Sequence, residues 1–245
     1  MRPGPWREAL LDVTSPSAVR ALIEKERPGL VFYVAYDKAR RDVTVDGARA
    51  AASAAASAGA RFVLISTDLV FDGQAGNYNE EMPATPIMPY GQLKVEAESA
   101  VRDASNASVI LRPSLLWGES GSTLRPAYEC DNLAAQQSID AYSDEWRSPL
   151  HVDDAARAAW EVGVTDTEGI YHIGGPERLS RFELAKRLCT VFGLDAALVK
   201  EAQRPEDRPR DTSLDSTRLL GLLDWVPRAV APIELTLEQA EVPIG

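Results

Sequence analysis

LVFYVAYDKARRDVTVDGARAAASAAASAGARFVLIS, residues 30–66, decides the fold of this 245-residue chain. It opens with the apolar run LVFYVA and closes with the apolar run FVLI, and strands that are covered on both faces of a sheet have this continuous character. Between the two runs, the alanine-rich residues 47–59 favour a helix packed closely on a sheet. A strand, a helix and a second strand in this order predict one unit of a parallel α/β sheet.

The same pattern continues towards the C-terminus. A helix is expected over about residues 90–104, a strand over 108–111, a helix over 153–162 and a short strand over 169–173. Ser180 with Glu183 forms the capping-box pattern that begins a helix, expected over residues 180–192. The fold class predicted is α/β: a Rossmann-like doubly wound parallel sheet, N-terminally incomplete, with a smaller C-terminal substrate lobe.

The domain division follows from these elements. Residues 1–118 with about 150–175 are predicted to form the Rossmann-like nucleotide-binding part. About residues 119–149 with 176–245 are predicted to form a small substrate-binding lobe over the carboxyl ends of the strands. Ligands of open α/β sheets bind at that edge.

Composition excludes several functions. The formal net charge is −11, which disfavours binding to a phosphate backbone, so no nucleic-acid partner is expected. Two histidines and the distant Cys130 and Cys189 fit no zinc spacing, so we expect no metal site and two reduced thiols. The chain has no apolar run of membrane-spanning length and no secretory signal, so we expect no membrane partner and a cytoplasmic location.

One pair of residues can carry reduction chemistry. Tyr90 and Lys94 are four residues apart at the start of a predicted helix, so they share one face. A nearby ammonium favours the phenolate, so we expect Lys94 to lower the pKa of Tyr90 towards working pH. Thr67, at the end of a predicted strand, could hydrogen-bond the same carbonyl oxygen that Tyr90 protonates. The bare spacing also occurs by chance in helices, and the strand-end Ser66-Thr67 before it is what favours a catalytic role.

Seven stretches carry a family resemblance. They are LLDVTSPSAVRALIEKERPGLV (residues 10–31), STDLVFDG (66–73), PYGQLKVEAE (89–98), ILRPSLLWG (110–118), DEWRSPLHVDD (144–154) and, near the end, GIYHIGGPERLSRFELA (169–185) followed by RPRDTSLDSTRL (208–219). Their order and spacing closely resemble those of the dTDP-4-dehydrorhamnose reductase family of extended short-chain dehydrogenases. That family includes the regulatory beta subunit of methionine adenosyltransferase. The segment DEWRSPLHV of this chain resembles the equivalent segment of that subunit at least as well as it resembles the bacterial reductases.

The resemblance implies a set of site residues. It assigns catalytic roles to Thr67, Tyr90 and Lys94. An NADP or NAD cofactor would be contacted by Asp12, Val13, Ala35, Ser66, Tyr90, Lys94, Pro113 and Ser114. A nucleotide-sugar would be contacted by Asp68, Trp146, Arg147 and Arg208. An arginine can bind a diphosphate in bidentate fashion, although a salt-bridged loop explains the two arginines equally well.

The sequence also departs from the family pattern. Family members begin with a strand and a G-x-x-G-x-x-G turn that binds the cofactor pyrophosphate, and this chain has no such motif. Cofactor binding would therefore lack its main phosphate anchor. The strand at residues 30–35 is then expected to have an open edge, which residues 8–13 (EALLDV) or a partner chain could cover. The family's Asn-Ala-Ala strand end is Tyr33-Val34-Ala35 here, and its N-V-x-G asparagine is Thr44.

Three functions remain open at this stage. The resemblance implies an NAD(P)H-dependent reductase of a nucleotide-linked 4-keto-6-deoxy sugar, with Tyr90 as proton donor. The alternative is a non-catalytic regulatory subunit that binds a methionine adenosyltransferase-like partner. The third is an inactive truncated form. A homodimer is also compatible with the open edge.

Overall fold

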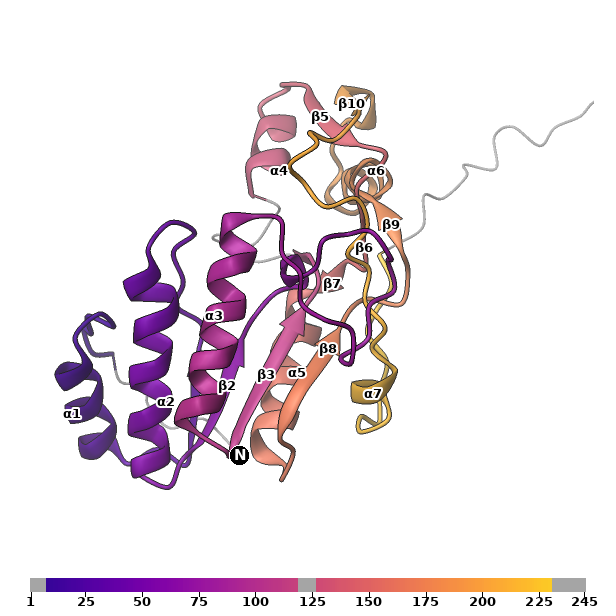
Figure 1. Ribbon diagram of the computed structural model, residues 1–245. Coiled ribbons are helices and arrows are strands. Elements are labelled where there is room, and N and C mark those ends of the chain that lie inside the picture. The colour runs from indigo at the N-terminus through magenta and orange to yellow at the C-terminus, as the bar shows by residue number, and fades with distance from the viewer. Residues whose placement is uncertain (1–7, 119–126, 231–245) are drawn as a thin grey trace, which may run out of the picture.

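A four-stranded parallel sheet forms the centre of the structure, a computed structural model that describes residues 8–118 and 127–230 (Figure 1). Its strands lie in the order β1-β2-β3-β8, and each pairs with its neighbours in parallel. The bounds are β1 (Leu30–Tyr33), β2 (Arg61–Ile65), β3 (Ser108–Pro113) and β8 (Gly169–Ile173). The predicted parallel α/β sheet is confirmed, with β1 ending two residues earlier than expected.

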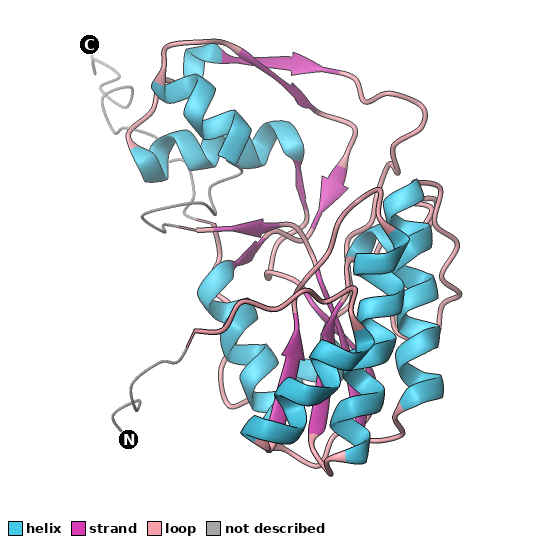
Figure 2. Cartoon of the chain, turned by 90° about the vertical axis from the view of Figure 1, so that its left-hand side faces the viewer, coloured by secondary structure: helices cyan, strands magenta, loops and turns pink. Residues whose placement is uncertain are grey.

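Helices cover both faces of this sheet (Figure 2). One face carries α1 (Pro16–Glu26), α2 (Gly47–Ser57) and α3 (Pro89–Ala104), and the other carries α5 (Val152–Val164) and α7 (Thr217–Leu220). Within β2, Phe62 and Leu64 pack with the first set of helices while Val63 packs with the second. Successive strand residues point to opposite faces, so a strand that is apolar at every position serves two cores at once.

Alanine makes the closest of these packings possible. Six residues of α2 are buried: Gly47, Ala48, Ala51, Ala52, Ala54 and Ala55. Their small side chains let α2 lie directly on β1 and β2 and between α1 and α3, as the composition predicts. A π-helical turn, Asp42–Asp46, precedes α2 and buries Thr44 and Val45.

A small lobe sits beyond the carboxyl ends of the strands (Figure 1). It contains α4 (Ala127–Ala134), β5 (Ile139–Tyr142), α6 (Arg181–Phe192), a 3-10 turn (Ala196–Leu198) and β10 (Val199–Ala202), with β5 and β10 parallel. The expected capping box at the start of α6 is present, because Ser180 accepts from the Glu183 amide and Glu183 accepts from the Ser180 amide. The lobe has its own apolar core around Leu133, Ala185 and Val199.

Short strands join the lobe to the sheet. They are the pair β4 (Leu116–Trp117) and β7 (Leu150–His151) and the antiparallel pair β6 (Trp146–Arg147) and β9 (Leu179–Ser180). The chain then returns to the sheet, where Leu219 is fully buried with α5, β3 and β8, and Trp225 packs on the same cluster. The sequence division placed this returning segment in the lobe, but the segment around α7 lies on the sheet.

The outer edge of β1 has no strand beside it within residues 8–118 and 127–230. The expectation that residues 8–13 pair with this edge is wrong, because they form no strand and Leu10 is fully exposed. Leu11 and Val13 instead pack against the helix-covered core. Near the edge, the rings of Phe32 and Trp160 stack at 6.3 Å between centroids.

Three other expectations concern absences and thiols. Of the helices in the described ranges, none has the length and apolar character needed to cross a bilayer. The described side chains also include no cluster of histidine, cysteine and acidic groups suited to a metal ion. Cys189 is a free, buried thiol, and the side chain of Cys130 lies outside the described part of the chain.

Candidate active site

The carboxyl ends of β1, β2 and β3 meet at one edge of the sheet, and the candidate site lies there. Parallel strands place all their carboxyl ends on the same side. Ala35, Ser66, Thr67 and Ser114 lie within two residues of the ends of these strands, so the fold brings the predicted strand-end residues to one edge. Pro113 is the last residue of β3 and is buried.

Lys94 lies inside this edge rather than on its surface. Only 2% of the residue is exposed, and its Nζ donates a 2.8 Å hydrogen bond to the carbonyl oxygen of Ile65, the last residue of β2. The ammonium also lies 5.9 Å from the centroid of the Tyr90 ring. Burial lowers the pKa of Lys94 to about 8, because desolvation disfavours the charged amine.

The pKa of Tyr90 shifts in the direction opposite to the one expected from the sequence. Burial raises the pKa of its phenol, and the nearby Tyr36 and Asp68 raise it further. The expectation that Lys94 lowers this pKa is therefore wrong for the protein alone: desolvation of the phenolate outweighs the attraction of the ammonium. Within the described residues the Tyr90 hydroxyl forms no hydrogen bond, and burial favours the neutral phenol over the phenolate.

Gly91 allows the first turn of α3, which carries Tyr90, to pack closely against the turn that follows β2. Helix α3 begins at Pro89, and its first turn packs against the 3-10 turn Asp68–Val70 that follows Thr67. A side chain at Gly91 would collide with the carbonyl oxygen of Leu69. The glycine in Tyr-Gly-Gln-Leu-Lys is thus required by close backbone approach rather than by an unusual backbone angle.

Behind Lys94, a buried network holds α3 to the sheet. The Glu98 carboxylate accepts from the Ser66 hydroxyl and binds the Arg112 guanidinium through two hydrogen bonds of 2.9 and 2.6 Å. His172 lies beside Arg112, and burial together with that guanidinium lowers the pKa of His172 to about 4. Ser66 is therefore engaged in fixing the scaffold, in the position that the resemblance assigned to cofactor contact.

Asp68 is the hub of a second buried network. Its carboxylate accepts from the hydroxyls of Ser114 at 3.0 Å and Thr212 at 3.2 Å, and it pairs with the Arg147 guanidinium at 3.1 Å. Thr67, next to it, caps the following turn by accepting from the Leu69 amide at 3.2 Å. Asp68 thereby connects the ends of β2 and β3 with the junction to the lobe.

Arg147 and Arg208 share one carboxylate. Glu145 is fully buried and binds Arg147 at 2.9 Å and Arg208 through two bonds of 2.6 and 2.9 Å. These arginines lower the pKa of Glu145 to about 2 against the effect of burial. Arg147 is buried and already paired with carboxylates, as the alternative of a salt-bridged loop predicts. Arg208 is paired as well, but 30% of its side-chain surface remains exposed.

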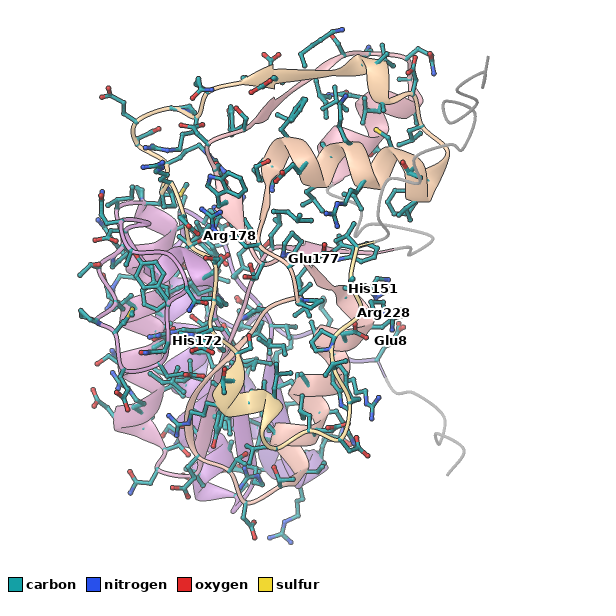
Figure 3. The ribbon with its side chains drawn as sticks, turned by 90° about the vertical axis from the view of Figure 1, so that its right-hand side faces the viewer. Glu8, His151, His172, Glu177, Arg178 and Arg228 are labelled. Atoms are coloured by element: carbon teal, nitrogen blue, oxygen red, sulfur yellow. The ribbon has the colours of Figure 1, made fainter. Side chains whose placement is uncertain are left out.

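Trp146 lies beside this pair at the junction of lobe and sheet. It is half-buried, and the Arg178 guanidinium covers its indole ring at 4.0 Å from the centroid. Figure 3 shows Arg178 between the lobe and the sheet, with His172 farther from the lobe.

Asp12 and Val13 lie in the turn before α1. The Asp12 carboxylate accepts from the amide and hydroxyl of Thr14, and these hydrogen bonds lower its pKa. The Val13 carbonyl lies against Gly47 at the start of α2.

Sequence reasoning missed four residues that shape the site. They are Tyr36, which contacts Tyr90 and Lys94, and Glu98, Glu145 and Thr212 of the two networks. Glu98 had a signal, because it lies four residues after Lys94 on the same helical face. Glu145 and Thr212 lie inside the stretches 144–154 and 208–219, but the pairing of Glu145 with Arg208 and of Thr212 with Asp68 joins segments that are distant in sequence.

Fold and site together define an α/β protein with a Rossmann-like parallel sheet, of the short-chain dehydrogenase class. The family model described as "RmlD substrate binding domain" matches residues 4–232, and the chain belongs to that family.

Three relatives illustrate its range. The chain is 31% identical over 172 residues to "Probable low-salt glycan biosynthesis reductase Agl14" of Haloferax volcanii, an alignment that spans 66% of this chain and 57% of that protein. It is 32% identical to the "Probable dTDP-4,6-dihydroxy-2-methyloxan-3-one 4-ketoreductase" of Streptomyces antibioticus, over 88% of this chain and 80% of the relative. It is 29% identical to "Methionine adenosyltransferase 2 subunit beta" of Bos taurus, over 89% of this chain and 72% of the relative.

A solved structure agrees with this assignment. The dTDP-4-dehydrorhamnose reductase of Bacillus anthracis, determined in complex with NADP, superposes with a TM-score of 0.80 at 27% identity. The match covers 89% of this chain and 83% of that one. The predicted family and fold are confirmed.

Proposed function

We propose that this protein is an NAD(P)H-dependent reductase of a nucleotide-linked 4-keto-6-deoxy sugar. The observation that carries the proposal is the buried Lys94 ammonium, bound to the Ile65 carbonyl at a strand end and adjacent to a neutral Tyr90. Burying a charged amine costs free energy, and a purely structural role would be served by an apolar side chain. Perturbed titratable groups at the carboxyl edge of an α/β sheet favour a functional site.

The nicotinamide half of a dinucleotide fits these residues. Only one protein hydrogen bond to the Lys94 Nζ is formed within the described residues, so its remaining N–H groups can bind ribose hydroxyls. Ala35, Pro113 and Ser114 would flank the ring, and Asp12 and Val13 would lie towards the adenine. When bound, the cofactor supplies hydride. The pyrophosphate half has no glycine-rich turn to bind it in the described ranges, so we expect weaker affinity than such a turn provides.

The chain's own residues would handle the proton. The Tyr90 hydroxyl donates its proton to the carbonyl oxygen of the substrate, and the Lys94 ammonium stabilises the phenolate that remains. Thr67 would orient the same oxygen through its hydroxyl. Because burial keeps Tyr90 protonated, the phenol is in the state that reduction requires.

The sugar nucleotide would lie between the sheet edge and the lobe. Arg208 is the candidate for its diphosphate, since its guanidinium is partly exposed and is held on one side by Glu145. Trp146 lies nearby, with the Arg178 guanidinium against its indole ring. Arg147 and Asp68 would shape the pocket from behind, since their charges already satisfy each other. We retain the division into a nucleotide-binding part and a substrate lobe as part of this proposal, with the segment around α7 assigned to the first.

Tyr90→Phe tests the reductase directly. We expect the variant to lose turnover of a dTDP-4-keto-6-deoxy sugar by a factor of about 10² or more, because the proton donor is gone while the ring remains. NADPH affinity, measured by calorimetry, should change little. A wild-type chain that binds no NADPH or NADH at millimolar concentration would contradict the proposal, as would a Tyr90→Phe variant with unchanged turnover.

A second candidate function is regulation of a methionine adenosyltransferase. It is favoured by the alignment with the beta subunit of Bos taurus, which covers 89% of this chain. Co-purification of the intact chain with a methionine adenosyltransferase catalytic subunit, together with a change in that enzyme's rate, would support this function. Turnover of a keto sugar without any such complex would favour the reductase.

A further inference from the structure

Tyr36 lies directly over the Tyr90–Lys94 pair. Its ring centroid is 5.6 Å from that of Tyr90, with the planes tilted by 49°. The Lys94 Nζ lies 5.4 Å from the Tyr36 centroid, slightly nearer than to the Tyr90 ring. The ammonium thus lies beside two aromatic rings that contact each other, while Tyr36 itself is 53% exposed. Tyr36 forms the solvent-facing side of this pair.

The loop that carries Tyr36 is fixed by Thr44. The Thr44 hydroxyl donates to the Asp37 carbonyl oxygen at 2.7 Å and accepts from the Asp37 amide at 2.9 Å. The Asp37 carboxylate in turn accepts from the amides of Ala39 and Arg40. Thr44 is 1% exposed and lies in the π-helical turn before α2, and such turns occur frequently at functional sites. The buried Thr44 hydroxyl therefore binds both the backbone amide and the backbone carbonyl of Asp37, the residue next to Tyr36.

This arrangement has a physical consequence for Lys94. A ring beside the ammonium excludes water, and the attraction between cation and ring compensates part of the lost hydration. The other groups that face the ammonium are Tyr90 and Glu98 on α3, with Arg112 of β3 paired to Glu98. Glu98 alone would raise the pKa of Lys94, yet burial dominates and lowers it.

We propose that Tyr36, held in place by Thr44, is a positioning residue of this site: its ring shields the Lys94 ammonium from water and fixes the orientation of the Tyr90 phenol. The consequence for catalysis rests on the proposed function, whereas the contact with Lys94 does not. The ring, rather than its hydroxyl, performs the role.

Competitive acetylation of lysines across a pH series, read by peptide mass spectrometry, tests the shielding without any cofactor. The midpoint of the Lys94 profile reports its pKa, and the absolute rate also reports access. We expect a midpoint near 8 in the wild type and in Tyr36→Phe. In Tyr36→Ala the midpoint should rise by about one pH unit, a tenfold change in the equilibrium, towards the ordinary lysine value.

Lys186 provides an internal control. Its Nζ lies 5.3 Å from the Phe182 ring centroid on α6, in the separate lobe, so its profile should be the same in every variant. Thr44→Val should shift the Lys94 midpoint in the same direction as Tyr36→Ala, and Thr44→Ser should restore the wild-type profile because it keeps the hydroxyl. An unchanged Lys94 midpoint in Tyr36→Ala overturns the proposal, as does a Tyr36→Phe profile equal to that of Tyr36→Ala.

Turnover gives the second readout. We expect Tyr36→Ala to lower kcat for the keto sugar by about tenfold with a smaller change in KM. Without the Tyr36 ring, the Tyr90 phenol is less well oriented for proton transfer in the transition state, while the contacts that bind the substrate remain. Tyr36→Phe should stay within about twofold of wild type. If the wild type has no turnover, the reductase proposal fails while the acetylation result still decides the role of Tyr36. If turnover is present and the Lys94 acetylation midpoints of the wild type and Tyr36→Ala coincide, the role proposed for Tyr36 fails and the reductase proposal does not.

Discussion

Glu145 is the residue whose ionisation matters most for the small-lobe junction. It is fully buried between Arg147 and Arg208, and those two guanidinium groups hold its pKa near 2, below the ordinary value of 4.5. A buried carboxylate with a depressed pKa stabilises the fold above its unfolded pKa, and this contribution is lost as pH falls through the folded value. The junction should therefore weaken in acid between about pH 4.5 and 2.

Glu145→Gln should destabilise the protein at neutral pH by about 3 kcal/mol, the size expected when one partner of a buried pair is removed. The difference from wild type should shrink as pH falls from 4.5 towards 2, because the wild-type carboxylate becomes protonated as well. Urea unfolding at several pH values measures this. Glu96→Gln is the matched control, since Glu96 pairs with Arg41 at a half-exposed surface site and should contribute little at any pH. A pH-independent difference for Glu145→Gln would contradict the assignment.

At the scale of elements, the start of α3 determines where Tyr90 lies. The helix approaches the end of β2 so closely that a side chain at Gly91 would strike the Leu69 carbonyl oxygen. Backbone cannot move aside as a flexible side chain can, so the helix itself would have to shift. Tyr90 and Lys94 would move with it.

Gly91→Ala should lower the unfolding free energy by about 1–3 kcal/mol, the usual cost of overpacking. It should also lower kcat by more than the loss of folded protein accounts for, because Tyr90 moves away from the end of β2. Gly29→Ala is the control, since nothing lies within 4 Å of a side chain added there. Equal stability and turnover for both variants would show that α3 tolerates the shift.

Across the whole molecule, Asp68 connects the sheet to the lobe junction. It binds Ser114 after β3, Arg147 in β6 and Thr212 in the segment that returns to the sheet. Since the lobe has its own core, these buried polar contacts join it to the sheet together with the strand pairs β4–β7 and β6–β9. The candidate substrate site lies between them, so its geometry depends on that connection.

Asp68→Asn should loosen the lobe relative to the sheet. The amide keeps the size of the side chain but removes the charge opposite Arg147, leaving that buried guanidinium with Glu145 as its remaining carboxylate partner and Thr212 as a hydroxyl partner. Hydrogen exchange should then accelerate in β6 and in the segment around Thr212, while β2 and β3 remain protected. Asp42→Asn, at an exposed pair with Arg40, should leave all of these rates unchanged. Uniform acceleration throughout the chain would indicate global destabilisation instead.

The sequence by itself determined the sheet, the order of its strands and helices, and the proximity of Tyr90 to Lys94. Each of these depends on local patterns: continuous apolar runs, alanine-rich helical stretches, a capping box and a four-residue helical spacing. Such patterns fix which face of an element is buried, because the periods of strand and helix are constant. The placement of Ser66, Thr67 and Ser114 at one edge followed from the same parallel topology.

Only the tertiary structure decided the electrostatics and the outer wall of the site. The pKa of Tyr90 was expected to fall and instead rises, because desolvation depends on everything packed around the phenol and not only on Lys94. Arg147 is engaged by the nearby Glu145 and also by Asp68, and the pairing with Asp68 joins distant segments. Tyr36 reaches Lys94 only because the turn held by Thr44 brings the chain back over the strand end. Charge and burial act through distances in space, and a sequence specifies those distances only once the whole chain is folded.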